Sequence, residues 1–210
     1  APNIKATANN TTSAVEWYID VWSDRMLINL LLLLIGKSTD TQTVFGNGHY
    51  TGSSSTSGSL LNTGEMNTKG LFWGTNGANS GVKVFGMENW WGNQWRRIAG
   101  WINNKGIQKI KMTYSQSDGS TTDGYNLDGS GYINIGCTPN GTSGSYINKM
   151  TFVENSLIPI TINGSSTTYY TDGLWFDNSK ISYAFVGAAS NTGMLTGAFS
   201  SNLYRDISTA

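Results

Sequence analysis

Apolar side chains are concentrated near the start of the chain, where their spacing predicts a helix. Residues 13–35 combine an amphipathic first half with the run Leu27–Ile35, which is apolar at nearly every position. Ser13–Glu16 has the spacing of a capping box, with a break allowed near Ser23-Asp24, and Gly36-Lys37 is a typical helix end. Because Leu27–Ile35 is apolar all round, we expect this half of the helix to be buried on nearly every side.

Downstream of this helix, apolar residues come in short runs separated by Gly, Ser, Asn and Thr, a pattern typical of strands joined by loops. We expect extended segments at residues 70–74, 82–85, 106–114, 132–137, 146–153, 157–162 and 182–187. Pro159 places residues 157–162 at a sheet edge or in irregular structure. Lys83 between Val82 and Val84 indicates a half-exposed strand, and residues 39–63 are expected to form a long loop.

One early helix followed by short strands predicts an α+β fold. Residues 1–12 are small and polar, and we expect a linker or arm there that docks on other proteins. Residues 13–210 are expected to form a single domain, because this length can bury one sizeable core.

Four of the eight tryptophans of the chain lie within Gly86–Gly106. They are Trp90, Trp91, Trp95 and Trp101, and Arg96-Arg97 lies at the middle of the same stretch. Large rings remove much apolar surface from water, so we interpret most of these tryptophans as core. The alternative is that one or two of them line a groove for a sugar or a partner protein.

The charge of the chain is low and balanced, with 13 basic and 13 acidic residues and a charged fraction of 12%. This balance favours neither nucleic acid nor an anionic membrane surface, which both require a positive field. Surfaces rich in hydroxyl and amide groups fit an extracellular protein or a virion surface. The run Leu27–Ile35 is far shorter than the ~20 apolar residues of a membrane span, and acidic rather than basic residues precede it, so a core helix is expected.

Few residues of the sequence are suited to catalysis. Cys137 and His49 are the only cysteine and histidine, so a disulfide within the chain is excluded, and we expect His49 to be a solvated loop residue. Glu88, beside the tryptophans, is the best candidate for a glycosidase acid. A structural role for Glu88, in which it binds backbone groups or Arg96, is the preferred interpretation.

Three acidic residues, Asp118, Asp123 and Asp128, lie in one Gly/Ser-rich segment and suggest calcium as an alternative to plain turn chemistry. Their spacing matches no EF-hand, and Asp-Gly pairs are common in turns. We therefore expect no metal and no cofactor.

Several segments together resemble bacteriophage proteins that carry a C-type lectin-like domain of the formylglycine-generating-enzyme-like type. The segments are Trp22–Leu31, Thr41–Gly48, Phe85–Trp95 and Tyr183–Phe199, the last of which is similar to the final core strands of the family. In some relatives that region is diversified by retroelements to bind new hosts. The enzymatic members depend on cysteines, so a lone Cys137 argues against their oxidation chemistry.

The resemblance implies a C-type lectin-like fold with a binding face built from later loops. This face would draw on Trp175, Asn178, Lys180, Ser190, Asn191, Met194, Asn202 and Tyr204. Amide and hydroxyl groups bond adaptably, and rings supply contact area, as such a face requires. The alternative interpretation makes Trp175 and Met194 core residues and the others ordinary solvated loops. The tail after Phe199 lacks the Asn/Trp-rich ending of many relatives.

The function that follows from these observations is a non-enzymatic binding module on a phage tail or head fibre. Its expected partners are a host cell-surface glycan or protein and, through the N-terminal arm, other virion proteins. The alternatives are a structural decoration or collar protein of the virion and a glycan-cleaving virion enzyme. Assembly into a homo-oligomer is left open, since no heptad or repeat supports it.

Overall fold

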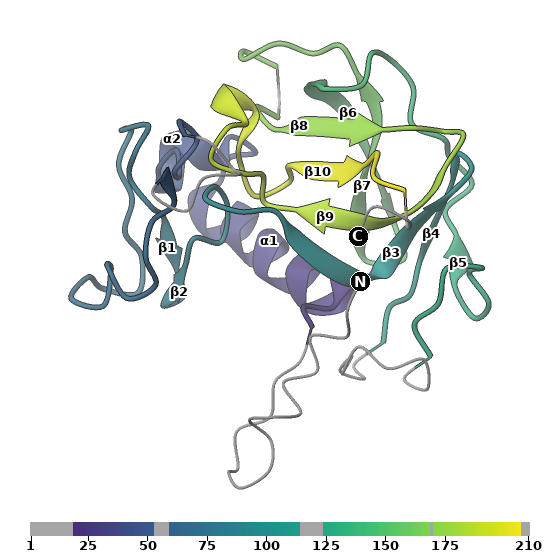
Figure 1. Ribbon diagram of the computed structural model, residues 1–210, viewed down its shortest axis with the longest axis horizontal. Coiled ribbons are helices and arrows are strands. Elements are labelled where there is room, and N and C mark those ends of the chain that lie inside the picture. The colour runs from purple at the N-terminus through teal and green to yellow at the C-terminus, as the bar shows by residue number, and fades with distance from the viewer. Residues whose placement is uncertain (1–18, 53–58, 114–123, 169, 207–210) are drawn as a thin grey trace, which may run out of the picture.

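The fold combines helices with a large curled mixed sheet, and most of its elements are strands (Figure 1). The computed structural model describes residues 19–52, 59–113, 124–168 and 170–206. The helices are α1 (Trp22–Gly36), the short α2 (Thr41–Phe45) and the 3₁₀ turn η2 (Gly193–Leu195). None of the described helices has the length and apolar character that crossing a bilayer requires.

The main sheet has eight strands in the order β5-β4-β3-β9-β10-β8-β6-β7. Only the pair β8 and β10 is parallel, and all other neighbours are antiparallel. A separate hairpin is formed by β1 (Lys83–Val84) and β2 (Met87–Glu88). The strands of the main sheet are β3 (Arg96–Asn104), β4 (Ile107–Ile110), β5 (Ile133–Asn134), β6 (Ser145–Val153), β7 (Ser156–Ile162), β8 (Gly173–Phe176), β9 (Ile181–Val186) and β10 (Ser201–Leu203).

Most of the expected extended segments are confirmed as strands. β1, β4, β5, β6, β7 and β9 fall in or on the segments predicted for them, and β7, which contains Pro159, lies at the sheet edge as expected. Residues 70–74 form no strand, because only Trp73 bridges to Lys83. Lys83 itself is buried rather than half-exposed, since its ammonium donates to the carbonyls of Met66 and Lys69.

The early helix is shorter and more exposed than its sequence predicts. Residues 13–18, which include the predicted capping box, lie outside the described residues. Residues 19–21 are not helical: Val21 bridges to Ala99 in the sheet, so α1 begins at Trp22. Residue Lys37 ends it in a left-handed conformation with φ 49°, and its N–H donates to the Leu33 carbonyl.

The expectation that Leu27–Ile35 is buried on nearly every side is wrong. Leu27, Leu34 and Ile35 are 58%, 72% and 52% exposed, because only one side of α1 packs on the sheet. The predicted long loop also contains α2, whose first turn is capped by Asp40 accepting from the Thr43 N–H.

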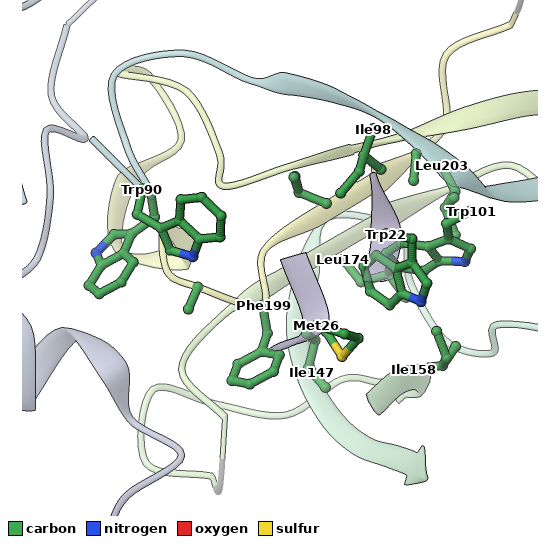
Figure 2. Close-up of a cluster of buried hydrophobic side chains, with 14 of the residues drawn as sticks. Trp22, Met26, Trp90, Ile98, Trp101, Ile147, Ile158, Leu174, Phe199 and Leu203 are labelled. Carbon is green, nitrogen blue, oxygen red and sulfur yellow. The ribbon is translucent and has the colours of Figure 1, made fainter. Parts of the chain in front are cut away.

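Most of the tryptophans are core residues, as the sequence predicts. Trp90, Trp91 and Trp101 are at most 5% exposed, and only Trp95 of that stretch is half-buried. Figure 2 shows Trp22 of α1 lying against Trp101 of β3, with ring centroids 4.5 Å apart. Each buried indole N–H has an acceptor, as buried polar groups require.

A buried arginine joins α1 to two distant segments. Arg25 donates to the carbonyls of Trp90 (2.9 Å) and Ala198 (3.0 Å), and its guanidinium lies 4.2 Å from the centre of the Trp90 ring. Burial, followed by the nearby charge of Arg96, lowers the pKa of Arg25 to about 9. Asn29 adds a bond to the same Ala198 carbonyl and accepts from the Trp90 indole. The tryptophan stretch and the β9–β10 loop are therefore held on one side of α1.

Candidate ligand-binding face

The central strands of the sheet have one buried side and one partly exposed side. In β9, Ser182, Ala184 and Val186 are buried, whereas the alternate residues Ile181, Tyr183 and Phe185 are half-buried. Val186 lines a small interior gap together with Trp22 and Met26 of α1, so the buried side faces the helix. Because successive strand residues point to opposite sides, Tyr183 and Phe185 face away from α1.

A row of four residues crosses neighbouring strands on this partly exposed side. Arg97 of β3 pairs with Phe185 of β9, Phe185 pairs with Asn202 of β10, and Asn202 pairs with Trp175 of β8. Residues in register on adjacent strands share one face of the sheet. Together with Trp95 and Tyr183, this row forms what we call the outer sheet face: Trp95, Arg97, Trp175, Tyr183, Phe185 and Asn202. In Figure 1, β8, β10 and β9 lie side by side across the front of the molecule.

Two of the tryptophans are in contact on the outer sheet face, and the residues beneath Trp175 are glycines. The rings of Trp95 and Trp175 are edge to face with centroids 5.5 Å apart. A Cβ atom at Gly173 would lie 2.7 Å from the Trp175 ring, and one at Gly144 would lie 2.9 Å from its indole nitrogen. Only glycine at these positions leaves room for the Trp175 ring in its place.

Arg97 supplies the positive charge of the outer sheet face. Its guanidinium carbon lies 4.6 Å from the centre of the Tyr183 ring and 5.8 Å from that of Phe185. Burial lowers the pKa of Arg97, while the nearby Tyr183 raises it. Within the described part of the chain, no carboxylate pairs with Arg97, and its Nε has no hydrogen-bond partner. A planar donor of this kind can donate hydrogen bonds to the oxygen atoms of a ligand while staying stacked on rings.

The eight binding residues predicted from the sequence fall into three groups in the structure. Trp175 and Asn202 lie on the outer sheet face. A second group, Asn178, Lys180 and Tyr204, lies where the β8–β9 connection passes the end of β10. There the Lys180 ammonium is 4.3 Å from the Tyr204 ring centre and 3.1 Å from Asp177, whose pKa is lowered to about 2 by bonds from Ser179 and Lys180. Asn178 donates to the Pro139 carbonyl.

The third group belongs to the β9–β10 loop, at the other end of the strands. Ser190 is fully buried, and its N–H donates to the Asn93 carbonyl, so its side chain is not on the surface. Asn191 and Met194 are exposed. The neighbouring Leu195 would contact a Cβ atom at Gly173, which brings this loop to the border of the outer sheet face near Trp175.

Sequence reasoning missed Arg97, Tyr183 and Phe185 as members of a face. The signal for the last two is the alternation of large and small residues in Ser182–Gly187, which was interpreted only as an apolar strand. Arg97 had no such signal, because β3 itself is not evident in the sequence.

A buried carboxylate anchors the β9–β10 loop close to this face. Asp172, just before β8, accepts from the Phe199 N–H at 2.7 Å and has no exposed surface. Burial raises the pKa of Asp172 to about 7; the bond from Phe199 lowers it, and the charge of Asp40 raises it further. Asp172 is therefore largely protonated below neutral pH.

The candidate catalytic acid has a structural role. Both carboxylate oxygens of Glu88 accept backbone N–H groups, from Gly64 at 2.6 Å and Met66 at 2.9 Å. Arg96 donates to the backbone carbonyl of Glu88 rather than to its carboxylate. These bonds confirm the preferred interpretation, in which Glu88 holds the loop before β1.

The other reactive residues also have ordinary environments. His49 is 4% exposed, and its Nε2 lies 2.5 Å from the Ser59 carbonyl, so the prediction of a solvated loop histidine is wrong. Cys137 is a half-buried free thiol, and burial raises its pKa.

The calcium alternative has little to support it in the described part of the chain. There, no three His, Cys, Asp or Glu side chains are grouped so as to hold a metal ion. Asp118 and Asp123 lie outside the described residues. Asp128 accepts from the Ser130 N–H at 2.7 Å, which is ordinary turn chemistry.

Comparison of the chain with models of protein families, with curated proteins and with solved structures gave no match. The function of the chain is therefore inferred from the geometry of the outer sheet face.

Proposed function

We propose that this chain is a non-enzymatic binding module of a bacteriophage tail or head fibre, with a C-type lectin-like fold, that recognises a glycan or a protein on the host cell surface. The outer sheet face is the observation that carries this proposal. The bonding of Glu88 to the backbone supports a role without catalysis.

The chemistry of the outer sheet face suits a ligand that has both apolar and polar surfaces. Trp95, Trp175 and Phe185 provide half-buried rings whose orientation is already set by packing, so little side-chain entropy is lost on binding. Asn202 lies between Phe185 and Trp175 in the cross-strand row, Arg97 lies at the end of the row beside Phe185, and both supply hydrogen-bond donors. A sugar ring, or a peptide segment with an acidic group opposite Arg97, meets both requirements.

The test is binding of the labelled protein to candidate host cells before and after enzymatic removal of surface glycans. Saturable binding that is lost on removal identifies a glycan receptor, and binding that survives identifies a protein receptor. Arg97→Ala and Asn202→Ala should each weaken binding about tenfold or more, as loss of a central polar contact does. Lys69→Ala is the matched control, because Lys69 lies 5.1 Å from the Trp73 ring centre near the β1–β2 hairpin, away from the outer sheet face.

Failure to bind any host strain would overturn this proposal. The runner-up, a structural decoration or collar protein, would then be tested by whether particles that lack the chain still adsorb normally. If Arg97→Ala and Asn202→Ala both bind as the wild type does, the binding site lies outside the outer sheet face.

A further inference from the structure

The side of α1 that faces away from the sheet carries an apolar stripe that no element of the described part of the chain covers. Leu27, Leu34 and Ile35 are 58%, 72% and 52% exposed, and Leu31 lies between them. Positions 27, 31, 34 and 35 follow the three- and four-residue spacing of one helix face. The opposite face, with Met26, Asn29 and Leu32, is buried. Large exposed aliphatic groups in one stripe mark an interaction surface.

Partly exposed apolar side chains of α2 and of the segment before β1 lie near the C-terminal end of α1. Val44 of α2 is 42% exposed and lies next to Gly36, where a Cβ atom would be 3.1 Å from it. Phe45 contacts the same glycine, and its ring centroid is 5.9 Å from that of Phe72, which is 39% exposed. Gly36 is two helical turns from the buried Asn29, so these contacts lie on the buried face of α1 and α2 is not part of the stripe.

Opposite charges lie at the two ends of this stripe. Asp24 is exposed in the first turn of α1, and Lys37 is exposed at its C-cap. The midpoint of these two positions falls between residues 30 and 31, at the centre of the stripe. A surface with an apolar centre and opposite charges at equal distances from it is complementary to itself after a two-fold rotation.

We propose that α1 is the interface through which two copies of this chain pair, antiparallel, about a two-fold axis at Leu31. In this arrangement Leu27 lies opposite Ile35 of the partner subunit, and Asp24 lies beside Lys37 of the partner subunit. The helix macrodipoles are then antiparallel, which is favourable. With ~22 Å of helix per copy, the contact lies at the small end of specific interface sizes. The pairing leaves the outer sheet face open, because that face points away from α1.

The first measurement is the mass of the full chain in solution by light scattering over a range of concentrations. We expect a dimer, and Leu27→Lys with Leu34→Lys should convert it to a folded monomer. Asp24→Lys should weaken the dimer severalfold, and Asp24→Lys with Lys37→Asp should restore it. A wild-type chain that stays monomeric up to ~100 μM would overturn the proposal, because a specific interface of this size is formed at such concentrations.

Single cysteines test the orientation, in a Cys137→Ser background that removes the native thiol. Leu31→Cys lies on the proposed axis and should form a disulfide with the same cysteine of the partner subunit. A disulfide requires Cα atoms about 4.4–6.8 Å apart, and the axis brings these two positions closest together. Leu27→Cys and Ile35→Cys should link poorly when alone and efficiently when the two proteins are mixed. If Leu27→Cys links to itself as readily as Leu31→Cys does, the helices are parallel or unpaired, and the proposal is wrong.

Discussion

The position of the Trp175 ring depends on the glycines beneath it. A methyl group at Gly173 would lie 2.7 Å from that ring and 2.9 Å from Leu195, so the ring would have to move. We expect Gly173→Ala to cost about 1–3 kcal/mol of folding free energy, as overpacking does, and to weaken host binding. Urea unfolding and cell binding measure the two effects. Gly70→Ala is the control, since nothing lies within 4 Å of a Cβ atom there, and equal results for both variants would contradict the prediction.

The buried carboxyl of Asp172 makes stability depend on pH. Its pKa is about 7 in the folded protein, against 3.8 for the free group, because burial disfavours the charge. Between these values the folded state holds a proton that the unfolded chain releases, so the stability contributed by this group falls as pH rises from about 4 to about 7. The resulting difference in unfolding free energy between pH 4 and pH 7 is on the order of 4 kcal/mol.

Urea unfolding at several pH values tests this dependence. Asp172→Asn is neutral at every pH and should flatten the decline in unfolding free energy between pH 4 and 7. Asp128→Asn, which changes an exposed turn carboxylate, should leave it unchanged. If the unfolding free energy of Asp172→Asn declines with pH at the same slope, other titrating groups cause the pH dependence.

The composition of the outer sheet face was only partly predictable from the sequence. Trp175 and Asn202 were predicted as binding residues through a family resemblance, and the structure places them in one cross-strand row. Ser190, from the same set, is buried, because the β9–β10 loop turns its backbone toward Asn93. Neighbours across a sheet are set by register between segments far apart in sequence, which no local pattern reveals.

At the scale of elements, β3, the longest of the central strands, could not be predicted from the sequence. Its pairing with β9 shifts between Arg97 and Ile102, and within that bulge Gly100 has a φ of 94°. The bulge lets Ile98, Ala99, Trp101 and Ile102 all be buried, so the alternation that identifies a strand is absent. The exposed side of α1 was not predicted either, since a helix that is apolar all round predicts burial on every side, whereas the described elements bury only one side.

Arg25 joins α1 to the tryptophan stretch and to the β9–β10 loop. Its removal leaves the carbonyls of Trp90 and Ala198 without these donors and opens a cavity. We expect Arg25→Ala to cost about 3 kcal/mol or more, and Arg25→Met, which retains most of the volume, to cost less. Thermal and urea unfolding measure both. Arg205→Ala, at an exposed arginine, should stay within about 0.5 kcal/mol of the parent. A similar small effect of Arg25→Ala would show that the helix is held by its apolar contacts alone.

At the scale of the whole molecule, the balance of 13 basic and 13 acidic residues predicts weak long-range electrostatics. Association with cells should therefore change less than about threefold between 50 and 500 mM salt, in contrast to nucleic-acid binding, which falls steeply. The rate of cell binding at several salt concentrations is the measurement, and passage through a heparin column without retention is its companion. A decline of tenfold or more would indicate a charged receptor surface.

The central place of β10 has a consequence for how the protein is made. Residues 201–203 fill the gap between β8 and β9, and they pair with both. A nascent chain whose synthesis stops before Ser201 leaves two facing rows of backbone groups unpaired in the middle of the sheet, and cellular quality control removes chains of that kind. Translation must therefore pass these residues before the sheet can close, so chains that stop before them give no stable product.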